Sequence, residues 1–288
     1  MHTCVTRLLT VATLAAVLWT PTHSQAATTW TSLDYPNAVA TFAQAINNSG
    51  TIAGGYLLND GSEHAFLYSN GGFTSFSVPN ATSTVITGIN DVGVMAGYYS
   101  DAGGVFHSFV YDGQNFSFLD FPGARAGSTI LAQINNSGMA AGSYASDDGA
   151  SHGFTYADGV FTSLDYPGAS ATWAYAINNN GDVAGGYTNS GSVYLTGFVR
   201  VGSDFHSVRY PAAADTSIRG LNDSRILAGL IGSPAGNTAG FMYGRGFHSL
   251  VFPGADFTVA YGLDNAGDVV GYYIDRRNGR GHGFVQTP

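Results

Sequence analysis

The chain has 288 residues, of which 40 are glycine and only 10% are charged, and its formal net charge is −9 at pH 7. An acidic chain whose basic residues are all arginine is a poor match to nucleic acid or to an anionic membrane surface. Plentiful glycine and aromatic residues favour many short strands joined by tight turns over helices.

The first predicted element is a signal for export. Arg7 precedes an apolar run at residues 8–19, and the small residues near Ala26 fit a cleavage site, so residues 1–26 are predicted to form a signal peptide. The run is too short to span a bilayer comfortably, and no membrane insertion of the mature chain is expected. The predicted location is therefore secreted or periplasmic, and Cys4, the only cysteine, would be removed with the leader.

Residues 27–288 are predicted to form a single domain built from a motif that occurs six times. Its clearest copy is residues 176–187, AINNNGDVAGGY. The apolar residue that opens the motif recurs every 42–45 residues, at Ile46, Ile89, Ile134, Ile177, Leu221 and Leu263. A period of this length is typical of a β-propeller or of another repeat array.

Each period divides into four strand-like pieces. The first contains a Thr and ends at an Asn-rich turn, whose Asn and Gly residues allow the positive φ of a tight hairpin. The second contains a Gly eight residues after the opening Ile or Leu, where a bulge or a close approach of backbones is expected. The third centres on a Phe, and the fourth ends at a Pro in most copies.

The two termini predict how the array closes. The mature chain begins with a lone fourth piece, Trp30–Pro36, and ends after a third piece that contains Phe284. The N-terminal strand can therefore complete the last blade and remove the exposed sheet edges. We predict an all-β, six-bladed β-propeller with four antiparallel strands per blade; a β-solenoid or prism is the alternative, and a solenoid would be expected to carry capping repeats.

The triplet at residues 64–66, His-Ala-Phe, and the turn at residues 88–93, Gly-Ile-Asn-Asp-Val-Gly, resemble the HAF family of probable extracellular repeat proteins. The resemblance covers essentially all of the mature chain. It implies bacterial export and a propeller-like array, and it brings no established activity and no catalytic residues. Copies four and five depart from the triplet, with Thr196 and Ala239 in place of His.

Three groups of polar residues are candidate sites. The repeated histidines of the third piece would lie too far apart to share one metal ion, so we expect them to pack and hydrogen-bond, and we predict no metal site and no cofactor. The Asp-aromatic-Pro segments, such as residues 34–36, could face a sugar, but we favour blade corners whose Asp accepts backbone N–H groups. The acidic turns at residues 59–63 and 146–149 lack the spacing of a calcium loop and are interpreted as solvated turns.

The strongest candidate site lies two residues before the opening Ile or Leu, where the copies stop agreeing. This position reads Gln44, Thr87, Ala132, Tyr175, Arg219 and Tyr261. The first strand of each blade lines the channel of a propeller, so Tyr175, Arg219 and Tyr261 are expected to share one wall. Aromatic rings and a guanidinium suit sugar stacking and carboxylate recognition. The predicted ligand-binding residues are Gln44, Trp173, Tyr175, Arg219 and Tyr261; the alternative is that this position only packs between blades.

Three functions follow from this sequence. The first is a secreted, non-catalytic propeller that binds an extracellular ligand, either carbohydrate or a cell-surface component; the uniform loop lengths favour binding over catalysis. The second is a lyase acting on acidic polysaccharide, with Tyr175 or Tyr261 as the base and Arg219 neutralising the substrate carboxylate. The third is a structural scaffold for protein interactions. No catalytic residues are assigned.

Overall fold

The structure is a computed structural model that describes residues 28–233 and 238–288. The predicted signal peptide, residues 1–26, lies outside the described residues. The described elements are all β-strands, joined by turns and loops. None of them is a helix of the length and hydropathy needed to cross a membrane.

The strands fall into four layers from the axis outward. The innermost are β2 (Ala40–Ile46), β6 (Ser83–Ile89), β10 (Ile130–Ile134), β14 (Ala171–Ile177), β18 (Asp215–Leu221) and β22 (Ala255–Leu263). The second are β3 (Ile52–Leu57), β7 (Met95–Ser100), β11 (Ala140–Ala145), β15 (Val183–Thr188), β19 (Leu227–Gly232) and β23 (Val269–Asp275). The third are β4 (Glu63–Ser69), β8 (Phe106–Tyr111), β12 (Ser151–Ala157), β16 (Thr196–Val201), β20 (Thr238–Tyr243) and β24 (Gly281–Thr287). The outermost are β5 (Gly72–Phe76), β9 (Phe116–Leu119), β13 (Val160–Leu164), β17 (Asp204–Val208), β21 (Phe247–Leu250) and β1 (Thr29–Leu33).

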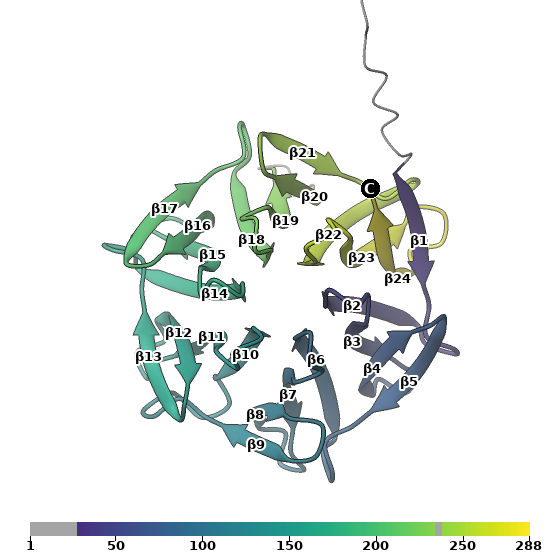
Figure 1. The fold of residues 1–288 in the computed structure, drawn as a ribbon, viewed down its shortest axis with the longest axis horizontal. Coiled ribbons are helices and arrows are strands. Elements are labelled where there is room, and N and C mark those ends of the chain that lie inside the picture. The colour runs from purple at the N-terminus through teal and green to yellow at the C-terminus, as the bar shows by residue number, and fades with distance from the viewer. Residues whose placement is uncertain (1–27, 234–237) are drawn as a thin grey trace, which may run out of the picture.

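The sheets stand around a common axis with their innermost strands facing it (Figure 1). Four sheets are separate and four-stranded, in the orders β6-β7-β8-β9, β10-β11-β12-β13, β14-β15-β16-β17 and β18-β19-β20-β21. Neighbouring strands within these sheets are antiparallel; β14 and β15, for example, pair in the register Ala174↔Gly185. The fold is an all-β β-propeller.

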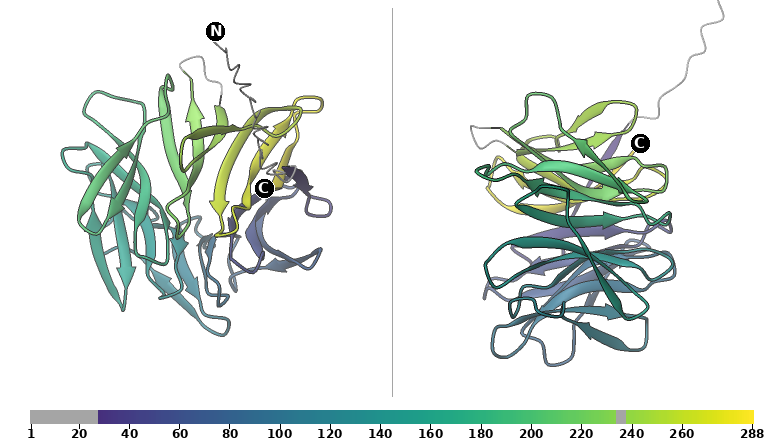
Figure 2. Two further views of the ribbon diagram at one scale, coloured as in Figure 1. Left: turned by 45° about the horizontal axis from the view of Figure 1, so that its top comes forward. Right: turned by 90° about the vertical axis from the view of Figure 1, so that its left-hand side faces the viewer.

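The remaining eight strands form one sheet at the seam of the ring. One antiparallel half is β2–β5, and the other is β22–β24 with β1 added outside β24 through the pair Trp30↔Gln286. The C-terminus accordingly lies beside β1 (Figures 1 and 2). A single parallel pair, Ala40↔Gly281, joins the halves. Of the six predicted blades of four antiparallel strands, four are separate sheets, and the parallel pair merges the first and last repeats into one sheet. The N-terminal strand β1 does pair with β24, as predicted.

A backbone bulge explains the Gly that recurs in the second strand of every repeat. The innermost strand has a register shift at the same place in each repeat, for example between Ala174 and Ala176. Opposite this shift, a Cβ on Gly185 would collide with the carbonyl oxygen of Trp173. The equivalent glycines are Gly54, Gly97, Gly142, Gly185, Gly229 and Gly271, and each meets the same kind of contact. Close approach of backbones therefore requires glycine here.

One Phe per repeat anchors the core. These fully buried rings are Phe66, Phe109, Phe154, Phe198, Phe241 and Phe284. Each packs with residues of its own and the neighbouring sheet; Phe198, for example, shares a cluster with Ala141 of β11 and Ile177 of β14. Burying such a ring removes about 150–250 Å² from water, so the propeller is stabilised mainly between its sheets.

Candidate functional site

The bulge residues of the innermost strands converge on one cavity on the propeller axis. These unpaired residues are Gln44, Thr87, Ala132, Tyr175, Arg219 and Tyr261. All six line a cavity of about 190 Å³, together with Tyr98 and Ile130. A bulge leaves its extra residue outside the ladder and re-aims its side chain, which explains why one residue per repeat reaches the axis.

Arg219 lies at the centre of the polar side of this cavity. Its guanidinium carbon is 3.7 Å from the centroid of the Tyr175 ring, and its Nε donates to Ser217 Oγ at 3.1 Å. No carboxylate in residues 28–233 or 238–288 forms an ion pair with Arg219. A cation placed over an aromatic face and left without a counter-ion is a ready partner for a carboxylate.

The tyrosines of the cavity are held in their neutral form. Burial raises the pKa of the Tyr175 and Tyr261 hydroxyls, and the nearby Arg219 charge offsets only part of each rise. Burial, with smaller contributions from Glu63 and Tyr261, raises the pKa of Tyr98 far above its ordinary value. At neutral pH these hydroxyls are therefore hydrogen-bonding groups rather than bases.

The opposite wall of the cavity carries smaller and less reactive side chains. The Thr87 hydroxyl donates to the backbone carbonyl of Leu131 at 2.7 Å, so it has a structural partner. Ala132 and Ile130 add only apolar surface. The cavity is consequently asymmetric, with aromatic rings and a cation facing small side chains.

The structure separates one predicted site residue from the rest. Gln44, Tyr175, Arg219 and Tyr261 share the axial cavity, whereas Trp173 lines a neighbouring cavity of about 350 Å³. Tyr175 borders both. Trp173 is paired with Gly186 in the ladder just before the bulge, so its side chain is not carried to the axis.

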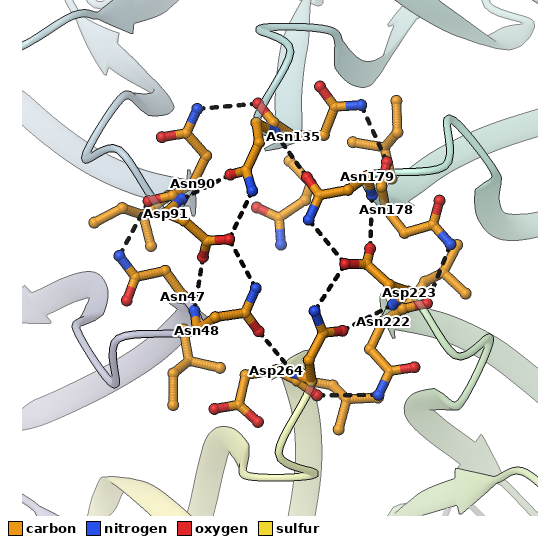
Figure 3. A pocket seen from close by; sticks show the side chains of 18 of the residues that line it. Asn47, Asn48, Asn90, Asp91, Asn135, Asn178, Asn179, Asn222, Asp223 and Asp264 are labelled. Carbon is orange, nitrogen blue, oxygen red and sulfur yellow. Dashed lines mark hydrogen bonds between the residues drawn. The ribbon is translucent and has the colours of Figure 1, made fainter.

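The Asn-rich turns form a double belt at the opposite end of the channel (Figure 3). The outer belt is the solvent-exposed one, whose side chains point toward the axis, and the inner belt is the buried one. In the outer belt each backbone N–H donates to the side-chain oxygen of the next repeat at 2.8–2.9 Å, and the belt closes from Asn265 back to Asn48. In the inner belt the Asn side chains donate to the next repeat's carbonyl, along Asn47, Asn90, Asn135, Asn178, Asn222 and Asp264. Asp264 replaces Asn, and its carboxylate has no donor to continue the inner belt to Asn47.

Two carboxylates in the outer belt are integrated into this network. The amides of Asn48 and Asn136 donate to Asp91 at 2.8 and 2.6 Å, and Asp223 has the matching pair of donors on the other side of the ring. Burial opposes the ionisation of Asp91 and Asp223, but these hydrogen bonds outweigh it and lower both pKa values. The belt is therefore a structural clasp that links every repeat to the next.

The repeated histidines and corners also have structural partners. The Nδ1 atoms of His107 and His152 lie 3.0 Å from the carboxylates of Asp120 and Asp165. We predicted that Asp accepts the backbone N–H groups of the corners. Instead, these N–H groups donate to the Thr hydroxyl of the following strand, as Tyr166 N does to Thr172 Oγ1. The same bond occurs at Thr41, Thr84, Thr129, Thr172, Thr216 and Thr258. The recurring Thr was visible in the sequence as the signal for this bond.

A larger cavity lies elsewhere, at the seam. It measures about 930 Å³ and is bounded by the corner at residues 34–40, by Tyr272 and by residues 279–282. The sequence did not point to it, because its walls come from the two ends of the chain. No group of three or more His, Cys, Asp or Glu side chains in the described segments is arranged to hold a metal ion.

No model of a known protein family and no curated protein matches the sequence. Solved structures do resemble the fold. A mutant of AofleA from Arthrobotrys oligospora is 14% identical with a TM-score of 0.52, over 86% of this chain and 84% of that one. Aleuria aurantia lectin in complex with Fucalpha1-6GlcNAc is 13% identical with a TM-score of 0.51, over 83% and 89%. The β-propeller domain of the Trilobed protease from Pyrococcus furiosus is 10% identical with a TM-score of 0.52, over 86% and 94%. At such identities the likeness establishes the β-propeller fold alone.

Proposed function

We propose that this protein is an exported, non-catalytic β-propeller of the HAF type that binds an extracellular carbohydrate in its axial cavity. Export and family rest on the leader and on the repeated motif of the sequence. We count the two antiparallel halves of the eight-stranded sheet as two blades, which makes the ring six-bladed. The observation that carries the proposal is Arg219, stacked on Tyr175 without a counter-ion in the described residues.

The chemistry of the cavity indicates an acidic sugar. Tyr175 and Tyr261 offer ring faces for a pyranose, and Arg219 offers N–H donors to a carboxylate. The cavity, at about 190 Å³, is smaller than the roughly 300–1,000 Å³ of sites that enclose drug-sized ligands. It therefore suits one sugar residue. One structural neighbour is a lectin in complex with a fucosylated glycan. A carbohydrate ligand is therefore compatible with this fold.

The lyase alternative meets one requirement and fails another. Arg219 and both tyrosines do line one cavity, as a polysaccharide lyase of this design would need. However, burial raises the pKa of both tyrosines, and a tyrosine base needs the opposite shift to be ionised near neutral pH. Binding without turnover is the better account of these residues. The scaffold alternative has no observation in its favour beyond the regular repeats.

The test is a titration with galacturonic acid, followed by calorimetry, of the wild type, Arg219→Gln and Arg245→Gln. Arg245 is exposed and lies far from the axial cavity in the turn before β21, so it is a matched loss of one positive charge. We expect Arg219→Gln to weaken binding about 10- to 100-fold, the size of a lost charge-assisted hydrogen bond of roughly 1.5–3 kcal/mol. Equal affinities for the two variants, or binding that is indifferent to the carboxylate in a comparison with galactose, would refute the proposal.

A further inference from the structure

The seam cavity lies between segments from the two ends of the chain. The corner at residues 34–40 and the segment at residues 279–282 face each other across about 930 Å³. Three contacts fix the gap: the parallel pair of Ala40 with Gly281, a hydrogen bond from Arg280 Nη2 to the Ala38 carbonyl at 3.0 Å, and His282 Nδ1 at 2.6 Å from Asp34. These contacts join the two ends of the chain beside the cavity.

Arg280 supplies a free cation to this cavity. The loop between β23 and β24 contains three arginines, and two of them are neutralised locally: Arg276 by Asp256 at 2.5 Å and Arg277 by Asp275 at 2.8 Å. Arg280 donates only to a backbone carbonyl, and no carboxylate of the described residues forms an ion pair with it. In a chain of net charge −9, an unpaired arginine at the wall of a cavity attracts an anion.

His282 contributes a buried ring nitrogen that has no hydrogen-bond partner in the described residues. In the first three repeats the Nε2 atom of the equivalent His has a partner in the preceding loop, at Ser62, Asp101 or Ser146. In the last repeat Asp275 occupies that loop position and forms an ion pair with Arg277. The Nε2 atom of His282 is therefore buried with no hydrogen-bond partner among the described residues. Because buried polar atoms are nearly always satisfied, this atom calls for a partner from outside them.

The seam cavity adjoins the axial cavity through one aromatic ring. Tyr272 lines the seam cavity, and its ring stacks on Phe42 with centroids 4.6 Å apart. Tyr272 is also close enough to Tyr261, a wall residue of the axial cavity, for the two hydroxyls to interact electrostatically. A Cβ at Gly281 would strike the Tyr272 hydroxyl, so the glycine leaves the room that this ring occupies at the seam.

Both cavities also lie toward the same face of the ring. Each innermost strand starts from a corner and ends at the Asn-rich turn, so the corners and the belt lie at opposite faces. The seam cavity is made of corner residues, and the axial cavity shares Ile130, Ala132 and Tyr175 with the neighbouring cavity, which reaches the corner at residues 125–128. A ligand bound at the axis can thus continue outward along one surface to the seam.

We propose that the seam cavity is a second subsite for the same acidic polysaccharide, with Arg280 contacting a carboxylate of a sugar unit several residues along the chain from the unit held by Arg219. This inference rests on the proposed function. Two linked weak contacts raise the affinity for a chain far above that for a single sugar, because the second contact is made at high effective concentration. The expected ligand is therefore a polymer of uronic acids rather than a terminal sugar.

The test compares galacturonic acid with oligogalacturonides of increasing length on the wild type and on Arg280→Gln, Arg219→Gln and Arg276→Gln. Arg276 belongs to the same loop but is already paired with Asp256, so it is the matched control. We expect Arg280→Gln to weaken binding of the longer oligomers about tenfold and to leave the monomer unchanged, whereas Arg219→Gln weakens both. Asn59→Ala, an exposed wall residue, should reproduce the selective effect more weakly, and circular dichroism will verify that each variant is folded.

The outcomes separate the two proposals. If Arg280→Gln binds long oligomers as the wild type does while Arg219→Gln does not, the seam subsite is refuted and the axial site stands. If Arg280→Gln weakens binding and Arg219→Gln has no effect, the axial function fails and with it the idea of one chain on two subsites. If the wild type binds neither monomer nor oligomer, both proposals are refuted.

Discussion

The turn and the bulge of the innermost hairpin differ in what they contribute. In the turn, Asn178 donates to the next repeat and its Oδ1 accepts two backbone N–H groups of its own turn. Three residues earlier Tyr175 stands on a bulge, unpaired in the ladder, with its ring under Arg219. The belt residue is nearly the same in every repeat, while the bulge residue differs between most of them. A residue that every repeat needs for a hydrogen bond is uniform, and a residue outside the ladder is free to line a site.

The largest effect is expected from a substitution that removes hydrogen bonds of the belt. Asn178→Ala would leave the Asn222 carbonyl and two turn N–H groups without their buried partner, at a cost of about 2–4 kcal/mol of unfolding free energy. Ligand affinity of the folded variant should not change. Urea unfolding measures the loss, with the exposed Asn115→Ala as control. Equal stabilities of the two variants would mean that the belt does not clasp the ring.

A smaller effect is expected where the inner belt lacks a hydrogen bond, between Asp264 and Asn47. Asp264→Asn provides the missing amide donor toward the Asn47 carbonyl and should stabilise the ring by about 1 kcal/mol at pH 7. Burial raises the pKa of Asp264 above its ordinary value, so the folded state binds its proton more tightly than the unfolded state does. The contribution of Asp264 to stability should therefore be lost as pH rises from about 4 through this raised pKa.

Melting temperatures at pH 4, 5 and 7 measure this difference. The advantage of Asp264→Asn over the wild type should grow with pH. Asp268 also has a raised pKa, caused first by burial and then by the charge of Asp264; the substitution removes the second cause, so Asp268 contributes in the same direction to the difference. An advantage that is constant across this range would show that ionisation of Asp264 has no part in the closure.

The smallest effect is expected from a substitution at a bulge position, in contrast to the belt position. Gln44 points to the axial cavity from the bulge of β2, and its side chain has no hydrogen bond in the described residues. Gln44→Ala should change stability by less than about 0.5 kcal/mol, as expected for a position without a structural partner. Its affinity for galacturonic acid should fall only a few-fold. A stability loss comparable to that of Asn178→Ala would assign the bulge positions a packing role and weaken the case for a site.

Most of the local architecture could be predicted from the sequence because it depends on neighbours. The turn at residues 178–181 needs Asn and Gly for its backbone, and the Gly of the second strand needs to lack a side chain opposite the bulge. These requirements recur in nearly every copy, so the period exposes them. The role of Thr172 at the corner was visible as a pattern, but its hydroxyl's partner was not, because a regular spacing does not identify the group that the hydroxyl binds.

The candidate site was predicted in part. The position of Tyr175, Arg219 and Tyr261 followed from the break in the repeat, and their meeting on the axis followed from a closed ring. Trp173 was named with them because it is close to Tyr175 in sequence; the structure places it on the neighbouring cavity, since its ladder pairing depends on where the bulge falls.

The sequence by itself therefore determined the repeat, the four strands in each copy, and the variable position that lines the axis, because all of these are set by residues close together in the chain. Only the tertiary structure decided the seam. There Ala40 pairs with Gly281, and the Arg280 side chain donates to the Ala38 carbonyl, across more than 240 residues of sequence. These contacts occur once in the ring and obey no period, so no comparison among the six copies could have revealed them. The free charge of Arg280 and the cavity beside it are consequences of that closure.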